Sequence, residues 1–239
     1  MAPLKSDSFA RLKAWLRQRA GRAEVIGLTE SVQAYFLSEV LADLERPTLM
    51  VLPDIKSAHA LYKVLQFFMK NEATQHPAFE SGLYPFFPYD ISPLSGLSPH
   101  RDLITQRIRA LYGLIHDKAA VVVTSLEAIC FNILPKDAFV NALQYFETGE
   151  EVDRRELIQT LETTGYQRTS LVEEQGDYSV RGGVIDLFSP LYPLPIRMEF
   201  WGDHLESIRH FDPVAQRSQA QTTSFILLPA AEIIMGPEN

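Results

Sequence analysis

The sequence predicts an α/β fold in two parts, a parallel-sheet domain followed by a smaller α+β domain. Strand-like and helix-like stretches alternate along the first part of the chain, and this alternation is typical of a parallel sheet. After Pro135 the strands become shorter and turn residues separate them, as antiparallel hairpins require. The turn dipeptides are Gly176-Asp177, Gly182-Gly183 and Gly202-Asp203. We therefore place the first domain at residues 1–135 and begin the second at residue 136.

The first part opens with a short basic amphipathic helix and then repeats strand and helix. Its expected strands are EVIGL (24–28), TLMVLP (48–53), GLYPFFPYD (82–90) and AAVVVTS (119–125). Its expected helices are residues 8–20, 29–45, 55–70, 101–117 and 126–134. Because TLMVLP and AAVVVTS are continuous apolar runs, they predict strands that are buried on both faces.

The second part contains one capped helix and several short strands. The helix is DRRELIQTLETTG (153–165), with Asp153 placed to cap its start, Glu156 at the capping-box position and Gly165 at its end. The expected strands are YQRTSLVEE (166–174), DYSVR (177–181), GVIDLFS (183–189), IRMEFW (196–201), HLESIRHF (204–211) and TTSFILLPA (222–230). The chain ends soon afterwards at GPEN without an obvious closing element, which favours a piece of a longer protein.

The composition indicates a folded chain that is not exported. Of its 239 residues 46% are apolar, enough for a hydrophobic core, and the net charge of −8 opposes autonomous nucleic-acid binding. The sequence has no apolar run long enough to cross a bilayer and no signal core at its start. Cys130 is the only cysteine, so an internal disulfide and a cysteine zinc cluster are excluded. We expect a cytoplasmic protein with no membrane partner.

The sequence offers weak candidates for catalysis. Residues 27–31 stand where a phosphate loop would follow the first strand, but they lack the GxxxxGK[ST] pattern, and Glu30 places a negative charge where phosphates would bind. No acidic helicase box occurs, Ser125 lies outside any nucleophile elbow, and the six histidines lack metal-ligand spacing. The single aspartates that follow apolar runs fit caps or turns: Asp54, Asp90 and Asp186. We therefore expect no catalytic, cofactor-binding or metal-binding residue.

A partner-binding surface is the stronger pattern. Residues 177–212 mix arginines with aromatic residues, the composition of interface hot spots. Strand alternation divides IRMEFW into a polar side with Arg197, Glu199 and Trp201, and an apolar side with Ile196, Met198 and Phe200. A large aromatic on a polar side suits a binding surface. The alternative interpretation is that Trp201 caps a small sheet while Arg197 pairs with Glu199 or another neighbour.

The same region resembles the transcription-repair coupling factor (Mfd) and UvrB families. The motifs are GDYSVRGGVIDLFSP, LPIRMEFWGDHLESIRHFDPVAQRS and FILLPA, with FPYD…SPHRDLITQRIRALYGL and VVVTS upstream, and the resemblance covers about residues 24–232. The segment YDISPLSGLSP (89–99) is too short for the long Tyr-rich hairpin of UvrB, which favours the coupling factors. Ser189 departs from the family pattern, in which Phe and Pro are often adjacent.

The resemblance implies a UvrB-like architecture and a partner. The first domain would be helicase-like, related to P-loop NTPases with a degenerate nucleotide site, and residues 136–220 would be an inserted α+β domain. Residues 221–239 would return as a strand to the first domain. The inserted domain of the family binds UvrA through two arginines and an aromatic residue, which match Arg181, Arg197 and Trp201 here. The aromatic residue is commonly Phe, so Trp201 keeps a large ring of different shape.

The resemblance also implies functions for a longer parent protein. Full-length members bind RNA polymerase and are ATP-dependent translocases on double-stranded DNA, through regions that this sequence does not contain. We therefore expect this chain to bind UvrA without hydrolysing ATP. The rival interpretation is a nucleotide- or DNA-binding helicase-like domain of an excision-repair protein.

Overall fold

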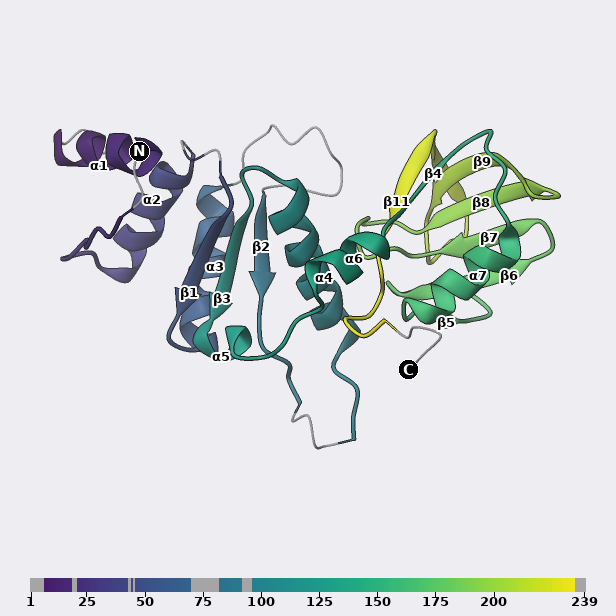
Figure 1. The fold of residues 1–239 in the computed structure, drawn as a ribbon, viewed down its shortest axis with the longest axis horizontal. Coiled ribbons are helices and arrows are strands. Elements are labelled where there is room, and N and C mark those ends of the chain that lie inside the picture. Colours follow the sequence, from purple (N-terminus) through teal and green to yellow (C-terminus); the bar gives the residue numbers. More distant parts are fainter. Residues whose placement is uncertain are drawn as a thin grey trace. The chain divides into compact units, whose positions relative to one another are not determined.

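The computed structural model describes residues 7–18, 21–42, 44, 46–69, 82–91 and 96–234 (Figure 1). The fold is mixed α/β, with one parallel sheet and two further sheets built mainly from antiparallel pairs. Unit 1 comprises Met1–Pro88 and Tyr112–Cys130, and unit 2 comprises Tyr89–Leu111 and Phe131–Asn239. The division between the units falls inside helix α4 (Arg101–His116). The expected domain boundaries at residues 135 and 220 stay predictions.

Unit 1 contains a three-stranded parallel sheet, as the alternation of strands and helices predicted. The strand order is β1 (Thr48–Leu52), β3 (Val121–Ser125) and β2 (Leu83–Phe86), and every residue of the central strand β3 is buried. The helices of this unit are α1 (Asp7–Gln18), α2 (Glu30–Leu41), α3 (Ile55–Phe68) and α5 (Leu126–Ile129). Helix α3 begins at a capped turn, since the Asp54 carboxylate accepts a hydrogen bond from the Ser57 amide at 2.8 Å.

Three predictions for unit 1 were wrong. Residues 24–28 form no strand, and Ile26 is 82% exposed, because no other described segment pairs with them. Strand β1 is not buried on both faces: it lies at the edge of the sheet, where Leu49 and Val51 are about half exposed. Helix α5 stops after four residues instead of continuing to residue 134.

Unit 2 is built on a six-stranded sheet in the order β10-β9-β8-β7-β6-β5. The bounds are β5 (Gln167–Arg168), β6 (Asp177–Arg181), β7 (Val184–Leu187), β8 (Ile196–Trp201), β9 (His204–Phe211) and β10 (Ser218–Thr222). All neighbours are antiparallel except β5 and β6, which are parallel. Strand β10, with the polar sequence SQAQT, was not predicted, and β5 is much shorter than expected.

One face of this sheet is the core of unit 2, which we call the apolar face. The side chains of Ile185, Leu187, Ile196, Met198, Leu205 and Ile208 are fully buried. Helix α7 (Arg154–Thr163) packs there with Leu157 and Leu161 buried. The Tyr178 hydroxyl donates to Glu162 at 2.8 Å, joining β6 to this helix. The predicted Asp153 cap is confirmed, since its carboxylate accepts from the Arg155 and Glu156 amides.

A second, two-stranded sheet completes unit 2, together with helix α6 (Lys136–Asn141), which was not predicted. Strand β4 (Gln144–Glu147) pairs antiparallel with β11 (Ser224–Leu227), and the stacked rings of Phe146 and Phe225 lie 5.2 Å apart. We expected the chain beyond residue 220 to return as a strand to the first domain. Its described strand, β11, pairs with β4, and the return to the first domain stays a prediction.

The segment after β11 is held to α4 by a buried ion pair. Arg107 of α4 is fully buried and donates to the Glu232 carboxylate from Nε and Nη2, and its guanidinium lies 4.4 Å from the centre of the Tyr89 ring. Burial, followed by the negative charge of Glu232, raises the pKa of the Tyr89 hydroxyl. All three residues belong to unit 2, so the pair fixes the end of this unit.

Leu161→Ala tests the packing of α7 on the apolar face. Leu161 is fully buried, so its truncation should lower the free energy of unfolding by about 2–5 kcal/mol in urea titrations. The matched control is Leu171→Ala, because Leu171 is about half exposed. Equal losses for the two variants would contradict this assignment of the core.

Candidate partner-binding surface

The three predicted partner-binding residues come from β6 and β8, two strands of the six-stranded sheet that are separated by β7. Arg181 ends β6 and Trp201 ends β8, while Arg197 lies earlier along β8. Two-residue turns follow both strand ends, and Gly182 (φ 59°) and Gly202 (φ 63°) adopt the left-handed conformation that these turns need. A side chain at Gly183 would meet the Phe200 carbonyl oxygen at 2.7 Å, so this position must stay small. These turns therefore fix the strand ends at which Arg181 and Trp201 lie.

A single buried carboxylate joins the two arginines. Asp186 of β7 lies between them in the sheet, and its side chain is 1% exposed. Arg197 donates to both Asp186 oxygens, from Nε at 2.7 Å and from Nη2 at 2.9 Å. Arg181 donates from Nη2 to Asp186 Oδ2 at 2.6 Å. The structure thus brings Arg181 and Arg197 together through a residue that sequence analysis had assigned to a cap or turn.

Arg197 is the more constrained of the two arginines. Its side chain is 17% exposed, against 49% for Arg181, and its guanidinium lies 4.7 Å from the centre of the Phe211 ring. The hydrogen bond to Asp186 raises the pKa of Arg197 above its ordinary value. Because a bidentate contact fixes one edge and the aromatic ring covers one face, this guanidinium keeps a defined orientation.

The charged row continues onto β9. Arg209 lies directly across from Arg197, and like charges at such positions repel. Glu199 offsets this repulsion: its Oε2 lies 3.4 Å from Arg209 Nη2 and accepts from the Ser207 hydroxyl at 2.5 Å. Three arginines and two carboxylates leave this row with one net positive charge. We call this set the arginine row: Arg181, Asp186, Arg197, Glu199 and Arg209.

Trp201 is the last residue of β8 and lies on the same side of the strand as Arg197 and Glu199, as the alternation predicted. The side chains of β8 alternate between buried and partly or fully exposed positions, and Trp201 is 78% exposed. The Asp186 pairing bears out the alternative that Arg197 contacts a neighbour, while the exposure of the indole argues against a capping role. Sequence reasoning placed Glu199 and Arg209 in this region but missed Asp186, whose partners lie on the strands at both sides of β7.

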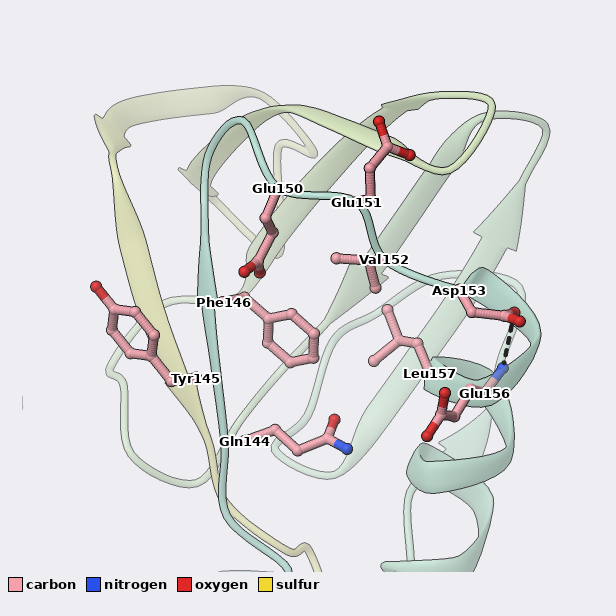
Figure 2. A pocket seen from close by; sticks show the side chains of 9 residues that line it. All are labelled: Gln144, Tyr145, Phe146, Glu150, Glu151, Val152, Asp153, Glu156 and Leu157. Carbon is pink, nitrogen blue, oxygen red and sulfur yellow. Dashed lines mark hydrogen bonds between the residues drawn. The ribbon is translucent and has the colours of Figure 1, made fainter.

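An acidic pocket of about 330 Å³ lies elsewhere in unit 2 (Figure 2). Four carboxylates line it, and three of them already serve the fold. Glu150 accepts from the Glu147 amide at 2.9 Å, Glu151 lies 3.1 Å from His204 Nδ1, and Asp153 caps α7. The fourth is Glu156. So many negative charges oppose phosphate binding, which makes this pocket unsuitable for a nucleotide.

The turn at residues 27–29 of unit 1, where the sequence lacks the phosphate-loop pattern, leads into α2. Gly27 has a φ of 81°, and Thr29 begins α2 without a side-chain hydrogen bond to the helix. Among the described residues, no group of three histidine, cysteine or acidic side chains could hold a metal ion. In the same part of the chain, no helix is long and apolar enough to cross a membrane.

Comparison with known proteins gives a consistent result. Residues 145–233 match the family described as the UvrB interaction domain, a range that contains the whole arginine row and Trp201. The chain is 34% identical over 230 residues to the transcription-repair-coupling factor of Myxococcus xanthus, covering 92% of the chain and 18% of that protein. The corresponding protein of Escherichia coli is 27% identical over 215 residues, which are 90% of the chain and 18% of the relative. That of Bacillus subtilis is 26% identical over 235 residues, which are 98% of the chain and 19% of the relative. The chain thus spans under a fifth of the length of each relative.

Titration with Mg-ATP tests whether unit 1 binds a nucleotide. A concentration of 1 mM Mg-ATP is about 100 times the dissociation constant of a tight nucleotide site. We expect this concentration to shift the melting temperature of the chain by less than ~1 °C. A functional site saturated to that degree would add ~2.7 kcal/mol and raise the melting temperature by roughly 5 °C or more. Magnesium without nucleotide is the control. A dose-dependent rise in the melting temperature that is seen only with ATP would support the rival interpretation, a nucleotide-binding helicase-like domain.

Proposed function

We propose that this chain, a homologue of the transcription-repair-coupling factors with a UvrB interaction domain at residues 145–233, is a docking module for the repair protein UvrA. The observation that carries the proposal is that Trp201, which is 78% exposed, lies on the same side of the six-stranded sheet as the half-exposed Arg181 and the partly exposed Arg197. Arg181, Arg197 and Trp201 are the residues that we propose to contact UvrA.

The chemistry of this surface suits a protein partner. Arginine and tryptophan are the residues that most often dominate binding energy at interfaces. A guanidinium recognises a carboxylate through directional, charge-assisted hydrogen bonds. An indole offers a large contact area with only two rotatable side-chain bonds, so ordering it on binding costs little conformational entropy. We infer that the arginines contact acidic groups of UvrA and that Trp201 enters an apolar recess beside them.

The parallel-sheet part serves this module as a scaffold and not as a motor. We propose that it is a helicase-like, UvrB-like domain whose nucleotide site has degenerated, with residues 136–220 inserted as the UvrA-binding domain. The missing phosphate-loop pattern at residues 27–31 and the negative charge of Glu30 support this reading. The chain itself would then hydrolyse no ATP.

For the whole protein, we propose the role of the relatives that the chain resembles. That protein would be a cytoplasmic, ATP-dependent translocase on double-stranded DNA that contacts stalled RNA polymerase through regions outside this sequence. The module described here would then recruit nucleotide excision repair by binding UvrA. The likeness to transcription-repair-coupling factors over at least 90% of this chain in the three relatives above supports the proposal.

Arg181→Glu tests the electrostatic part of the surface. Because Arg181 donates to the buried carboxylate of Asp186, charge reversal should lower the melting temperature and also weaken UvrA binding at least ~30-fold, so binding is measured at a temperature at which circular dichroism shows the variant folded. Arg155→Glu is the matched control, since it changes the charge equally at an exposed position of α7. Calorimetry or co-elution with UvrA measures the effect, and equal binding by both variants would count against the proposed surface.

Substitution of Trp201 tests the aromatic part. Trp201→Ala should weaken UvrA binding by roughly 2 kcal/mol or more, the loss typical of an interface hot spot. Trp201→Phe should retain most of the affinity, because it keeps a large ring. Since the indole is exposed, neither variant should change the free energy of unfolding by more than ~0.5 kcal/mol. Full affinity in the alanine variant would exclude Trp201 from the interface.

A further inference from the structure

Asp186 is the one member of the arginine row that is out of reach of any partner. Its side chain is 1% exposed, yet it accepts hydrogen bonds from arginines on the strands at both sides, β6 and β8. A buried carboxylate is costly unless charged donors satisfy it, and here both oxygens are occupied. Its position therefore fixes two guanidinium groups relative to one another.

The contacts leave specific donors free. Arg197 uses Nε and Nη2 on Asp186, and Arg181 uses Nη2. Within the part of the chain that the structure describes, neither guanidinium donates a further hydrogen bond, so Nη1 of both residues and Nε of Arg181 remain available. These groups belong to planar forks whose orientation Asp186 sets. Two oriented forks with free donors match carboxylates presented side by side.

We propose that Asp186 is a positioning residue for partner binding, which holds Arg181 and Arg197 in the orientation that receives carboxylates of the partner. This inference rests on the proposed function, and it adds a residue that touches no partner. The direction in which the affinity changes when Asp186 is neutralised distinguishes positioning from bulk electrostatics. Removing a negative charge makes the surface more positive, so bulk electrostatics alone predicts tighter binding of an acidic partner. Positioning predicts weaker binding, because the guanidiniums lose their common anchor.

Asp186→Asn is the first variant, since it keeps the shape and removes the charge. We expect UvrA affinity to fall at least ~10-fold, although the surface becomes more positive. Asp186→Glu keeps the charge on a longer side chain and should recover part of the affinity. Circular dichroism and melting curves establish that each variant is folded before binding is measured. Unchanged or tighter binding by folded Asp186→Asn overturns the proposal.

A double-mutant cycle separates positioning from a general structural role. Asp186→Asn is measured in the wild-type chain and in the Arg197→Ala background, where one of the two anchored guanidiniums is already gone. Positioning predicts that the effect of Asp186→Asn shrinks several-fold in this background, because the two changes remove one arrangement. Additive losses overturn the proposal, because they would show that Asp186 affects UvrA binding independently of Arg197.

A second readout does not depend on UvrA. The ¹⁵N-labelled side-chain Nε–H signals of the arginines can be followed by NMR during titration with a short glutamate-rich peptide. Stronger shifts of the Arg181 and Arg197 signals in the wild type than in Asp186→Asn support positioning, and equal or stronger shifts in the variant overturn it. If the wild type fails to bind UvrA, the proposed function falls, and this titration still decides the role of Asp186.

Discussion

The carboxylate of Asp186 is 1% exposed, and its contacts arrange the side of the sheet opposite the apolar face. Antiparallel strands send alternate side chains to opposite faces, so Ile185 and Met198 lie on the apolar face while Asp186 and Arg197 lie on the other, where Phe211 is buried as well. Asp186 lies between Arg181 and Arg197 and bonds to both, while Glu199 offsets the repulsion between Arg197 and Arg209, which lie directly opposite each other. Together the two carboxylates leave the arginine row with one net positive charge.

This arrangement explains how an acidic chain can present a surface for acidic groups. The net charge of −8 is spread over the whole sequence, whereas the arginine row is local and lies beside an exposed indole. Screening by salt weakens distant charges more than charges in contact, so the proposed recognition would depend on the local row more than on the net charge. The acidic pocket of unit 2, by contrast, has three of its four carboxylates engaged in a backbone hydrogen bond, a helix cap and a histidine contact.

Sequence reasoning succeeded where local rules decide the outcome. The alternation in IRMEFW, the cap at Asp153 and the strand His204–Phe211 depend on neighbours along the chain, and the structure confirms them. It failed where tertiary pairing decides. Residues 24–28 have a strand-like sequence but no described partner strand, and the polar β10 becomes a strand only because β9 lies beside it. Asp186 resembled a cap or turn residue because its two partners are identified only by the register of β6, β7 and β8.

The chain contains two tryptophans, and this allows a direct test of the central claim that UvrA binds the sheet side carrying the arginine row. The indole N–H signals of Trp15 in α1 and Trp201 in β8 can be followed by NMR as UvrA is added to ¹⁵N-labelled chain. The account predicts that the Trp201 signal shifts or broadens at substoichiometric UvrA while the Trp15 signal stays in place. A complex that perturbs Trp15 and leaves Trp201 unchanged would contradict it.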